Sequence, residues 1–320
     1  MVDSKQQWKA WLYLAPAIIL LLIFTVWPII NTVRMAFING YDYTYLAENT
    51  KDEKILTIGI RNFATVIRNP FFTDALKTTM ILCVLTVPIS TILALLIAVC
   101  LNSIKPLQKL LQTIFFLPYV TNSIAIGMVF ATMFNVIGNI IAGDLYGPTV
   151  TSPGIINWLL DCFGMDRINW MNSGSSYTAN IAVMVIYIVW NALPFKILIL
   201  LGGLQSINKQ YYDAAKVDST PRRRVFTRIT VPLLSPMLAY VVITGFIGGF
   251  KEYSSIVGVF GDKMGPPDDA GRLNTVVGMI YDSIEKRSYG IASAGALILF
   301  VIILIVTFIN LWVSKKKVHY

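Results

Sequence analysis

Charged residues and histidine are both scarce in this chain. Charged residues make up 13% of the 320, and the one histidine, His319, stands next to the carboxyl terminus. A histidine general base, a histidine-rich metal site and a Ser-His-Asp triad are therefore excluded. The sequence also lacks the Gly-x-x-x-x-Gly-Lys-Ser/Thr loop that cradles nucleotide phosphates. We expect no ATP hydrolysis by this chain, no other enzymatic activity, no cofactor and no bound metal.

Cysteine is equally rare. Cys83, Cys100 and Cys162 are an odd number of residues scattered along the chain, which does not indicate a disulfide framework. We interpret all three as small apolar packing residues.

Long apolar runs are what the sequence has in abundance. Hydrophobic residues make up 56% of it, far more than in a soluble domain. A helix needs roughly 20 apolar residues to cross the hydrocarbon of a bilayer, and no train of short alternating segments indicates a β-barrel. The sequence therefore predicts an all-α polytopic membrane protein with six transmembrane helices in one domain, residues 1–320. The predicted spans are 11–37, 75–102, 111–137, 178–204, 231–257 and 290–313.

The net charge of +9 is spread unevenly. If the amino terminus is cytoplasmic, the segments on that side hold most of the cations, whereas the outer loops hold more acidic than basic residues. The positive-inside rule therefore puts both termini in the cytoplasm. With anionic lipid as the partner of these cations, nucleic-acid binding is not expected. The cytoplasmic cations are Lys5, Lys9, Lys105, Lys109, Lys209, Lys216, Arg222, Arg223, Arg224, Arg228, Lys315, Lys316 and Lys317.

The largest polar connection on the cytoplasmic side is the loop 205–232. Gln210 to Asp218 is predicted to form about two helical turns, with a break at Ser219 and Thr220. Pro221 suits the first position of a second short helix, which Pro232 is predicted to end. This helix carries the arginines 222–224 and 228. The two predicted helices together form either a solvated polar surface or a docking site for a soluble partner.

The same loop resembles the EAA loop of the membrane-spanning subunits of binding-protein-dependent ABC importers. The family pattern is Glu-Ala-Ala, two residues, Asp-Gly-Ala and, after about eight more residues, Ile-x-Leu-Pro. Asp213 replaces the Glu and Ser219 replaces the turn Gly, so we expect mild strain or a different turn, with Ser219 or Thr220 capping the next helix. The resemblance implies that an ATPase is coupled through Asp213, Ala214, Ala215, Asp218, Ser219, Arg222, Ile229 and Pro232.

The resemblance covers nearly the whole chain and is strongest to the carbohydrate-importing branch, the relatives of the maltose and raffinose permeases. It rests on ALKTT at the start of the second span, LQTIFFLPYVTNS from Leu111, WNALPFKILILLGGL from Trp190 and YGIASAGALILF from Tyr289. The loop VFGDKMGPPDD departs from the family's Thr-x-Gly-Gly-Pro. The resemblance implies the ABC type I importer permease fold in a bacterial cell membrane. It also implies a second homologous permease subunit in a heterodimer, cytoplasmic ATP-binding subunits and an extracytoplasmic solute-binding protein.

Polar and aromatic residues at membrane depth mark a candidate solute pathway. Polar groups are costly there unless they face the bundle interior or a watery cavity. Aromatic faces, amides and hydroxyls also suit a sugar, and by resemblance several of these residues fall on sugar-contacting positions of the maltose permease. The predicted pathway residues are Tyr119, Asn122, Ser123, Trp190, Asn191, Phe195, Gly245, Gly248, Gly249 and Glu252.

Each of these residues also has a plainer interpretation. Tyr119 and Trp190 suit interfacial or helix-packing positions equally well, and the glycines suit close helix approach. We expect Lys251 and Glu252 to extend toward the outer interface rather than pair with a ligand, and Lys196 to extend toward the inner one.

We therefore predict a permease subunit of a binding-protein-dependent ABC importer. It moves a sugar, in particular an oligosaccharide, by alternating access driven by a partner ATPase. The main alternative is an importer for another polar solute, such as a polyamine or phosphate. An ion-coupled secondary transporter is a further alternative, but it needs ionisable residues in mid-span and few are present.

Overall fold

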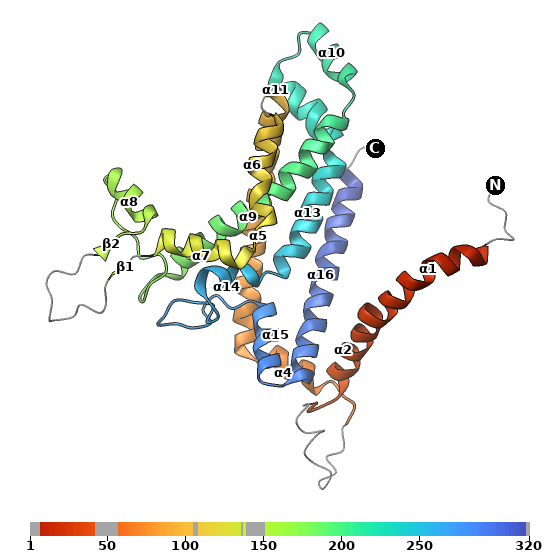
Figure 1. Ribbon diagram of the computed structural model, residues 1–320, viewed down its shortest axis with the longest axis vertical. Coiled ribbons are helices and arrows are strands. Elements are labelled where there is room, and N and C mark those ends of the chain that lie inside the picture. The colour runs from red at the N-terminus through yellow and green to blue at the C-terminus, as the bar shows by residue number, and fades with distance from the viewer. Residues whose placement is uncertain (1–6, 42–56, 105–107, 136, 139–150, 318–320) are drawn as a thin grey trace. The chain divides into compact units, whose positions relative to one another are not determined.

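The computed structural model is built almost entirely of helices (Figure 1). It describes residues 7–41, 57–104, 108–135, 137–138 and 151–317, so that Lys5, Lys105 and His319 lie outside the described residues. The chain divides into two compact units. One comprises residues 1–73 and 278–301, and the other comprises residues 74–277 and 302–320.

The first unit takes its helices from both halves of the sequence. It contains α1 (Gln7–Leu21), the π-helical turn η2 (Leu22–Val26), α2 (Trp27–Phe37), α4 (Arg61–Arg68), most of α15 (Val276–Glu285) and the first part of α16 (Tyr289–Lys317). Asn62 of α4 is buried, and its side-chain amide donates to the carbonyl oxygens of Ala36 (3.0 Å) and Ile38 (2.8 Å). These bonds hold the end of α2 against α4.

The second unit contains the long helices α5 (Pro70–Ser103), whose first residues belong to the other unit, and α9 (Tyr177–Ser206). Helix α6 packs along α9, and α7 packs against α14. The remaining elements are α6 (Gln108–Val120), α7 (Ser123–Phe134), the paired strands β1 (Ile137–Gly138) and β2 (Thr151–Ser152), α8 (Ile155–Cys162), α10 (Lys209–Val217), α11 (Arg222–Val225), the π-helical turn η4 (Phe226–Thr230), α12 (Val231–Leu233), α13 (Ser235–Phe250) and α14 (Ser254–Phe260).

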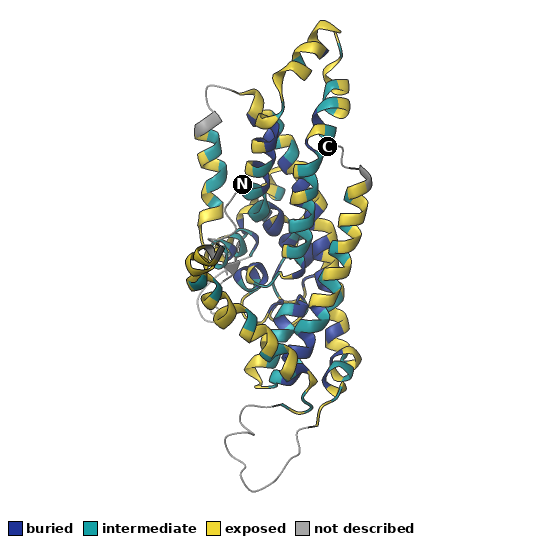
Figure 2. Cartoon of the chain, turned by 90° about the vertical axis from the view of Figure 1, so that its right-hand side faces the viewer, coloured by how far each residue is buried: buried dark blue, intermediate teal, exposed yellow. Residues whose placement is uncertain are grey.

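Two buried clusters hold the second unit together, and Figure 2 shows buried residues concentrated along its long helices. One cluster joins α9 to α7 and α14, and the fully buried Tyr187 belongs to it. The other joins α5, α9 and α13, where the small residues Ala94 and Ala98 are fully buried. Large apolar side chains remain exposed along the long helices, as expected where lipid is the solvent.

Four helical runs among the described residues are long and apolar enough to cross a membrane, and there are up to six if each of two bent pairs is one span. The four runs overlap the first, second, fourth and sixth predicted spans. They are Trp11–Phe37, Pro70–Ser103, Tyr177–Ser206 and Tyr289–Lys315.

The third predicted span, 111–137, is not a single helix. Leu110–Val120 and Ser123–Phe134 are bent by 98° relative to each other. At the break, the Asn122 side chain accepts the backbone N–H groups of Ile124 (2.9 Å) and Ala125 (3.4 Å). A capping residue therefore starts a new helix in the middle of the apolar run.

The fifth predicted span, 231–257, also differs. Pro232 does not end the preceding helix, because it lies in α12 and the helical run continues from Arg222 to Leu233. The helical run Arg222–Leu233 then bends by 65° into α13. Helix α13 ends at Phe250, and residues 251–253 separate it from α14.

Candidate functional site

A cavity of about 290 Å³ lies among α5, α6, α9 and α13 of the second unit. All of the predicted pathway residues line it except Asn122, Ser123 and Trp190. The lining consists of Thr86, Val87, Ser90, Tyr119, Ile188, Asn191, Ala192, Phe195, Lys196, Val241, Thr244, Gly245, Gly248, Gly249 and Glu252.

Tyr119 of α6 and Phe195 of α9 form an aromatic surface on this cavity. Their ring centroids are 5.8 Å apart and the rings are inclined by 20°, a stacked arrangement. Tyr119 is 51% exposed, so much of the residue remains uncovered by the chain itself. Such a surface can cover the C–H face of a ring-shaped polar ligand.

The joint between α6 and α7 is held by hydroxyl groups. The Asn191 amide lies 3.5 Å from the Ser123 hydroxyl, which lies 3.1 Å from the hydroxyl of Tyr187. Tyr187 also donates to the backbone carbonyl of Ser123. We did not single out Tyr187 from the sequence, because a tyrosine in an apolar run resembles a packing residue. Asn122 caps α7 and Trp190 packs into the core, so neither side chain lines the cavity.

The three glycines of α13 have different surroundings. A Cβ atom at Gly249 would lie 2.8 Å from the sulfur of Cys83, so this glycine permits close helix packing. A Cβ atom at Gly245 would lie 3.3 Å from Nζ of Lys196. A Cβ atom at Gly248 would meet nothing within 4 Å, so this glycine keeps cavity volume open.

Lys196 does not extend toward the inner interface, and that prediction was wrong. Its side chain points into the protein, where the residue is only 5% exposed. The ammonium donates to Ser90 Oγ (2.6 Å), Thr91 Oγ1 (3.1 Å) and the carbonyl of Val87 (3.3 Å). These three oxygens of α5 satisfy the three N–H donors, which makes burial tolerable. Hydropathy could not reveal this, since the acceptors lie on a distant helix.

Glu252 also lines the cavity, contrary to the prediction that it extends toward the outer interface. Its carboxylate accepts the backbone N–H of Ser255 at 3.1 Å, in the first turn of α14. The hydroxyl of Thr275 donates to the backbone carbonyl of Glu252 at 2.9 Å. The neighbouring Lys251 is exposed.

The polar loop forms a pair of short helices, α10 and α11, at one end of the second unit (Figure 1). Ser219 lies in the break between them with φ of 50°, a left-handed conformation that carries the predicted strain. Pro221 precedes α11 as its cap residue and no side chain caps this helix, so the predicted capping by Ser219 or Thr220 is not found.

Helix α10 presents a mixed face. Asp213 and Ala214 are exposed, whereas Ala215 is buried. Asp213 forms an ion pair with Lys216 at 3.0 Å, and because both side chains are largely exposed the pair contributes little to stability. Val217 is 85% exposed, which is unusual for an apolar side chain on a polar helix.

A second cavity, of about 560 Å³, is lined by residues of this helix pair together with residues of α5 and η4. Ala215, Ser219 and Arg222 line it, whereas Asp218 ends α10 and the half-buried Ile229 and Pro232 belong to η4 and α12. The full lining is Val99, Tyr212, Ala215, Lys216, Ser219, Thr220, Arg222, Val225, Phe226 and Thr230.

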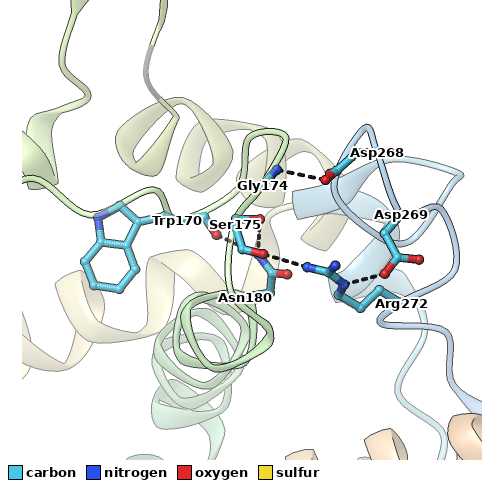
Figure 3. Close-up of polar contacts among 7 residues, drawn as sticks. All are labelled: Trp170, Gly174, Ser175, Asn180, Asp268, Asp269 and Arg272. Atoms are coloured by element: carbon cyan, nitrogen blue, oxygen red, sulfur yellow. Dashed lines mark hydrogen bonds and ion pairs between the residues drawn. The ribbon is translucent and has the colours of Figure 1, made fainter.

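The loop before α9 is joined to the loop after α14 by polar contacts (Figure 3). Arg272 donates to the carbonyl of Ser175 at 2.6 Å, and the N–H of Gly174 donates to the carboxylate of Asp268 at 2.8 Å. The buried Asn180 of α9 donates to the hydroxyl of Ser175 at 3.0 Å. The two loops therefore form one connected surface at the start of α9.

Long apolar helices around a cavity that carries a few polar side chains, with an exposed helix pair at one end, are features of a membrane permease. The family described as the binding-protein-dependent transport system inner membrane component matches residues 62–319 of this chain. The chain belongs to this family.

Several permeases are similar to this chain over nearly its whole length. The arabinooligosaccharides transport system permease protein AraP of Halalkalibacterium halodurans is 26% identical, covering 97% of this chain and 89% of that protein. The lactose transport system permease protein LacF of Rhizobium radiobacter is 26% identical, covering 97% and 95%. The trehalose/maltose transport system permease protein MalF of Thermococcus litoralis is 27% identical, covering 96% and 94%.

A solved structure has the same fold. A chain from the crystal structure of a bacterial ABC transporter involved in the import of the acidic polysaccharide alginate matches with a TM-score of 0.76 and 23% identity, covering 98% of this chain and 97% of that chain. The predicted all-α fold of an ABC importer permease is thereby confirmed.

Proposed function

We propose that this chain imports a sugar, in particular an oligosaccharide, as the permease subunit of a binding-protein-dependent ABC importer. The observation that carries the proposal is the Tyr119–Phe195 stack beside Asn191 on one cavity. A pyranose ring needs a flat apolar surface for its C–H face and polar groups for its hydroxyls, and this cavity offers both. The names of relatives that import arabinooligosaccharides, lactose and trehalose or maltose support the same class.

The size of the cavity also bears on the solute. Its volume, about 290 Å³, is at the lower end of the range for ligand pockets. The cavity therefore takes a short saccharide, or part of a longer one as the chain passes through.

The energy comes from a partner ATPase that binds α10. In this proposal both termini and α10 lie in the cytoplasm, as the distribution of positive charge indicates. Asp213 gains a charge-assisted hydrogen bond in the partner, which is stronger than a neutral one, while Val217 and Ala214 supply apolar contact. A second homologous permease subunit completes the pathway, and an extracytoplasmic solute-binding protein delivers the sugar.

Sugar uptake by the reconstituted complex tests the proposal. Tyr119→Ala and Asn191→Ala should each raise the sugar concentration for half-maximal uptake about tenfold, the effect of losing one good ligand contact. Leu117→Ala is the matched control, because Leu117 is exposed on the same helix as Tyr119 and does not line the cavity. Unchanged half-saturation in both cavity variants would remove the support for the solute class.

A further inference from the structure

Lys196 places a buried positive charge on the solute cavity. Its ammonium is bound only by neutral oxygens, and none of the ion pairs among the described residues includes it. A buried charge is normally paired with an opposite charge, because neutral hydrogen bonds compensate only part of the lost hydration. Glu252 is the one acidic residue among the described residues that line the same cavity, and it forms no ion pair with Lys196. The negative charge that pairs with Lys196 is therefore to be sought in the ligand.

The surroundings hold this ammonium in one place. The Ser90 hydroxyl donates to the carbonyl of Thr86, and the Thr91 hydroxyl donates to the carbonyl of Val87. Since both hydroxyl protons are engaged on α5, the oxygen lone pairs face Lys196 and accept from it. The charge is thus a fixed feature of the cavity wall rather than a mobile side chain.

Gly245 leaves space beside the ammonium. A Cβ atom at this position would lie 3.1 Å from Cγ1 of Val87 and 3.3 Å from Nζ of Lys196, closer than ordinary van der Waals contact, and glycine has none. Lys196 and Gly245 both line the cavity. Glycine at this position therefore leaves the cavity-facing side of Lys196 uncovered by a side chain of α13.

We propose that the cavity recognises a saccharide that bears a carboxylate, such as a uronic acid unit, with that carboxylate at Lys196. This inference rests on the proposed function and names the class of sugar. The ligand carboxylate takes over the N–H donor now directed at the carbonyl of Val87, which is the longest of the three hydrogen bonds at 3.3 Å. The exchange is favourable because an ammonium–carboxylate hydrogen bond is shorter and roughly twice as strong as a neutral one. The same charge disfavours a ligand ammonium group beside Lys196, because two ammonium groups repel each other.

Glu252 carries a carboxylate on the same cavity wall as the ammonium of Lys196, so the two residues attract different parts of a ligand. Glu252 lies two residues beyond the end of α13, and its carboxylate accepts the backbone N–H of Ser255. A ligand carboxylate is attracted to Lys196 and repelled by Glu252, whereas sugar hydroxyls can donate hydrogen bonds to the Glu252 carboxylate. The acidic unit lies toward Lys196 and the neutral hydroxyls lie toward Glu252.

Calorimetric titration of the purified complex of permease and ATPase subunits tests the inference. The probes are digalacturonate and galactobiose, which differ in carrying a carboxylate or a neutral hydroxymethyl group on each ring. We expect digalacturonate to bind at least tenfold more tightly, an effect typical of a hydrogen bond between charged groups. Lys196→Gln should abolish the preference, Lys196→Arg should keep it, and Glu252→Gln should increase it.

The outcomes distinguish recognition of the ligand carboxylate by Lys196 from a purely structural role of Lys196 between α5 and α9. If Lys196→Gln weakens the binding of both probes equally, the lysine serves only to hold α9 against α5, and the inference is overturned. Equal binding of both probes by the wild type also overturns it but leaves the proposed sugar import standing. Binding of neither probe overturns it too, and the uptake assay then decides on sugar import. If Lys196→Gln does not fold, the wild-type preference and its decline with salt still give the answer.

Discussion

The backbone N–H of Thr220 donates to the carbonyl oxygen of Ala215 at 2.9 Å, across the end of α10. The N–H of Ser219 donates to the carbonyl of Lys216 at 3.0 Å. Together these bonds form a Schellman motif, in which the residue after the cap adopts a left-handed conformation. Ser219 occupies that position with φ of 50°, where glycine would carry no steric cost.

Ser219→Gly should therefore stabilise the protein. Relief of left-handed strain contributes about 1 kcal/mol, which corresponds to a rise in Tm of roughly 2 °C for a domain of this size. Thermal unfolding of the detergent-purified complex measures the shift. Ser219→Ala is the control, since alanine keeps the Cβ atom and should leave Tm nearly unchanged. A lower Tm for the glycine variant would contradict the strain argument.

Gly127 of α7 and Gly258 of α14 allow these helices to touch. A Cβ atom at Gly127 would lie 2.7 Å from the Cα of Gly258, and a backbone atom cannot move aside. Gly127→Ala should therefore destabilise the protein by about 1–3 kcal/mol, the usual effect of overpacking. Gly202→Ala is matched to it, because Gly202 lies within α9 with nothing within 4 Å of its Cβ position.

The Gly202→Ala variant should gain about 0.5–1 kcal/mol from helix propensity. Opposite shifts in Tm for the two alanine variants are the expected result. Equal shifts would show that the α7–α14 contact is looser than the structure has it.

Asp213→Ala should separate ATP hydrolysis from transport. Loss of the carboxylate removes the charge-assisted contact that we propose with the ATPase, so uptake should fall at least tenfold while basal hydrolysis continues. Asp213→Glu keeps the charge and should retain uptake. Lys216→Ala breaks only the exposed ion pair within α10 and should transport normally. Full transport by Asp213→Ala, at normal expression, would show that Asp213 is not part of the docking contact.

The segment at the end of α8 and the loop after it should become less stable in acid. Arg167 donates from Nε to both carboxylate oxygens of Asp161, at 3.0 and 2.9 Å, and from Nη2 at 2.8 Å. Hydrogen bonding to Arg167 and its charge hold the pKa of Asp161 below its usual range. A lowered pKa means that the ion pair stabilises the loop above the unfolded pKa, about 3.9, and that this contribution disappears as pH falls through the lower folded value.

Hydrogen exchange of residues 159–168 measures this contribution. The backbone amides of this segment should exchange faster in Asp161→Asn than in wild type at pH 7. The difference in exchange rate between the two proteins should be smaller at pH 3. Asp166→Asn removes a neighbouring charge outside the Asp161–Arg167 pair and should have little effect. A difference between Asp161→Asn and wild type that is the same at both pH values would exclude the ion pair as its cause.

The apolar runs and the polar helix pair were accessible from the sequence, because both depend on local properties. Hydropathy alone marks the long spans, and the left-handed strain at Ser219 follows from a non-glycine residue in a turn position. The break in the third span was missed for an equally local reason. Asn122 is a good helix cap, but its neighbours are apolar enough to hide the break.

The cavity wall could not be derived in this way. Lys196 is stabilised by Ser90 and Thr91, which lie more than one hundred positions away in the sequence. The expectation that it extends toward an interface treats the lysine as an isolated side chain in lipid. Tyr187 was missed because its partner, Ser123, likewise lies on another helix.

The π-helical turn Phe226–Thr230 lies between the arginines of α11 and the helix α13. Such a turn accommodates one surplus residue within a helix and is frequent at functional sites. A displacement of α10 that is passed along the backbone must therefore cross this turn, α12 and a bend of 65° before it reaches the cavity-lining helix α13.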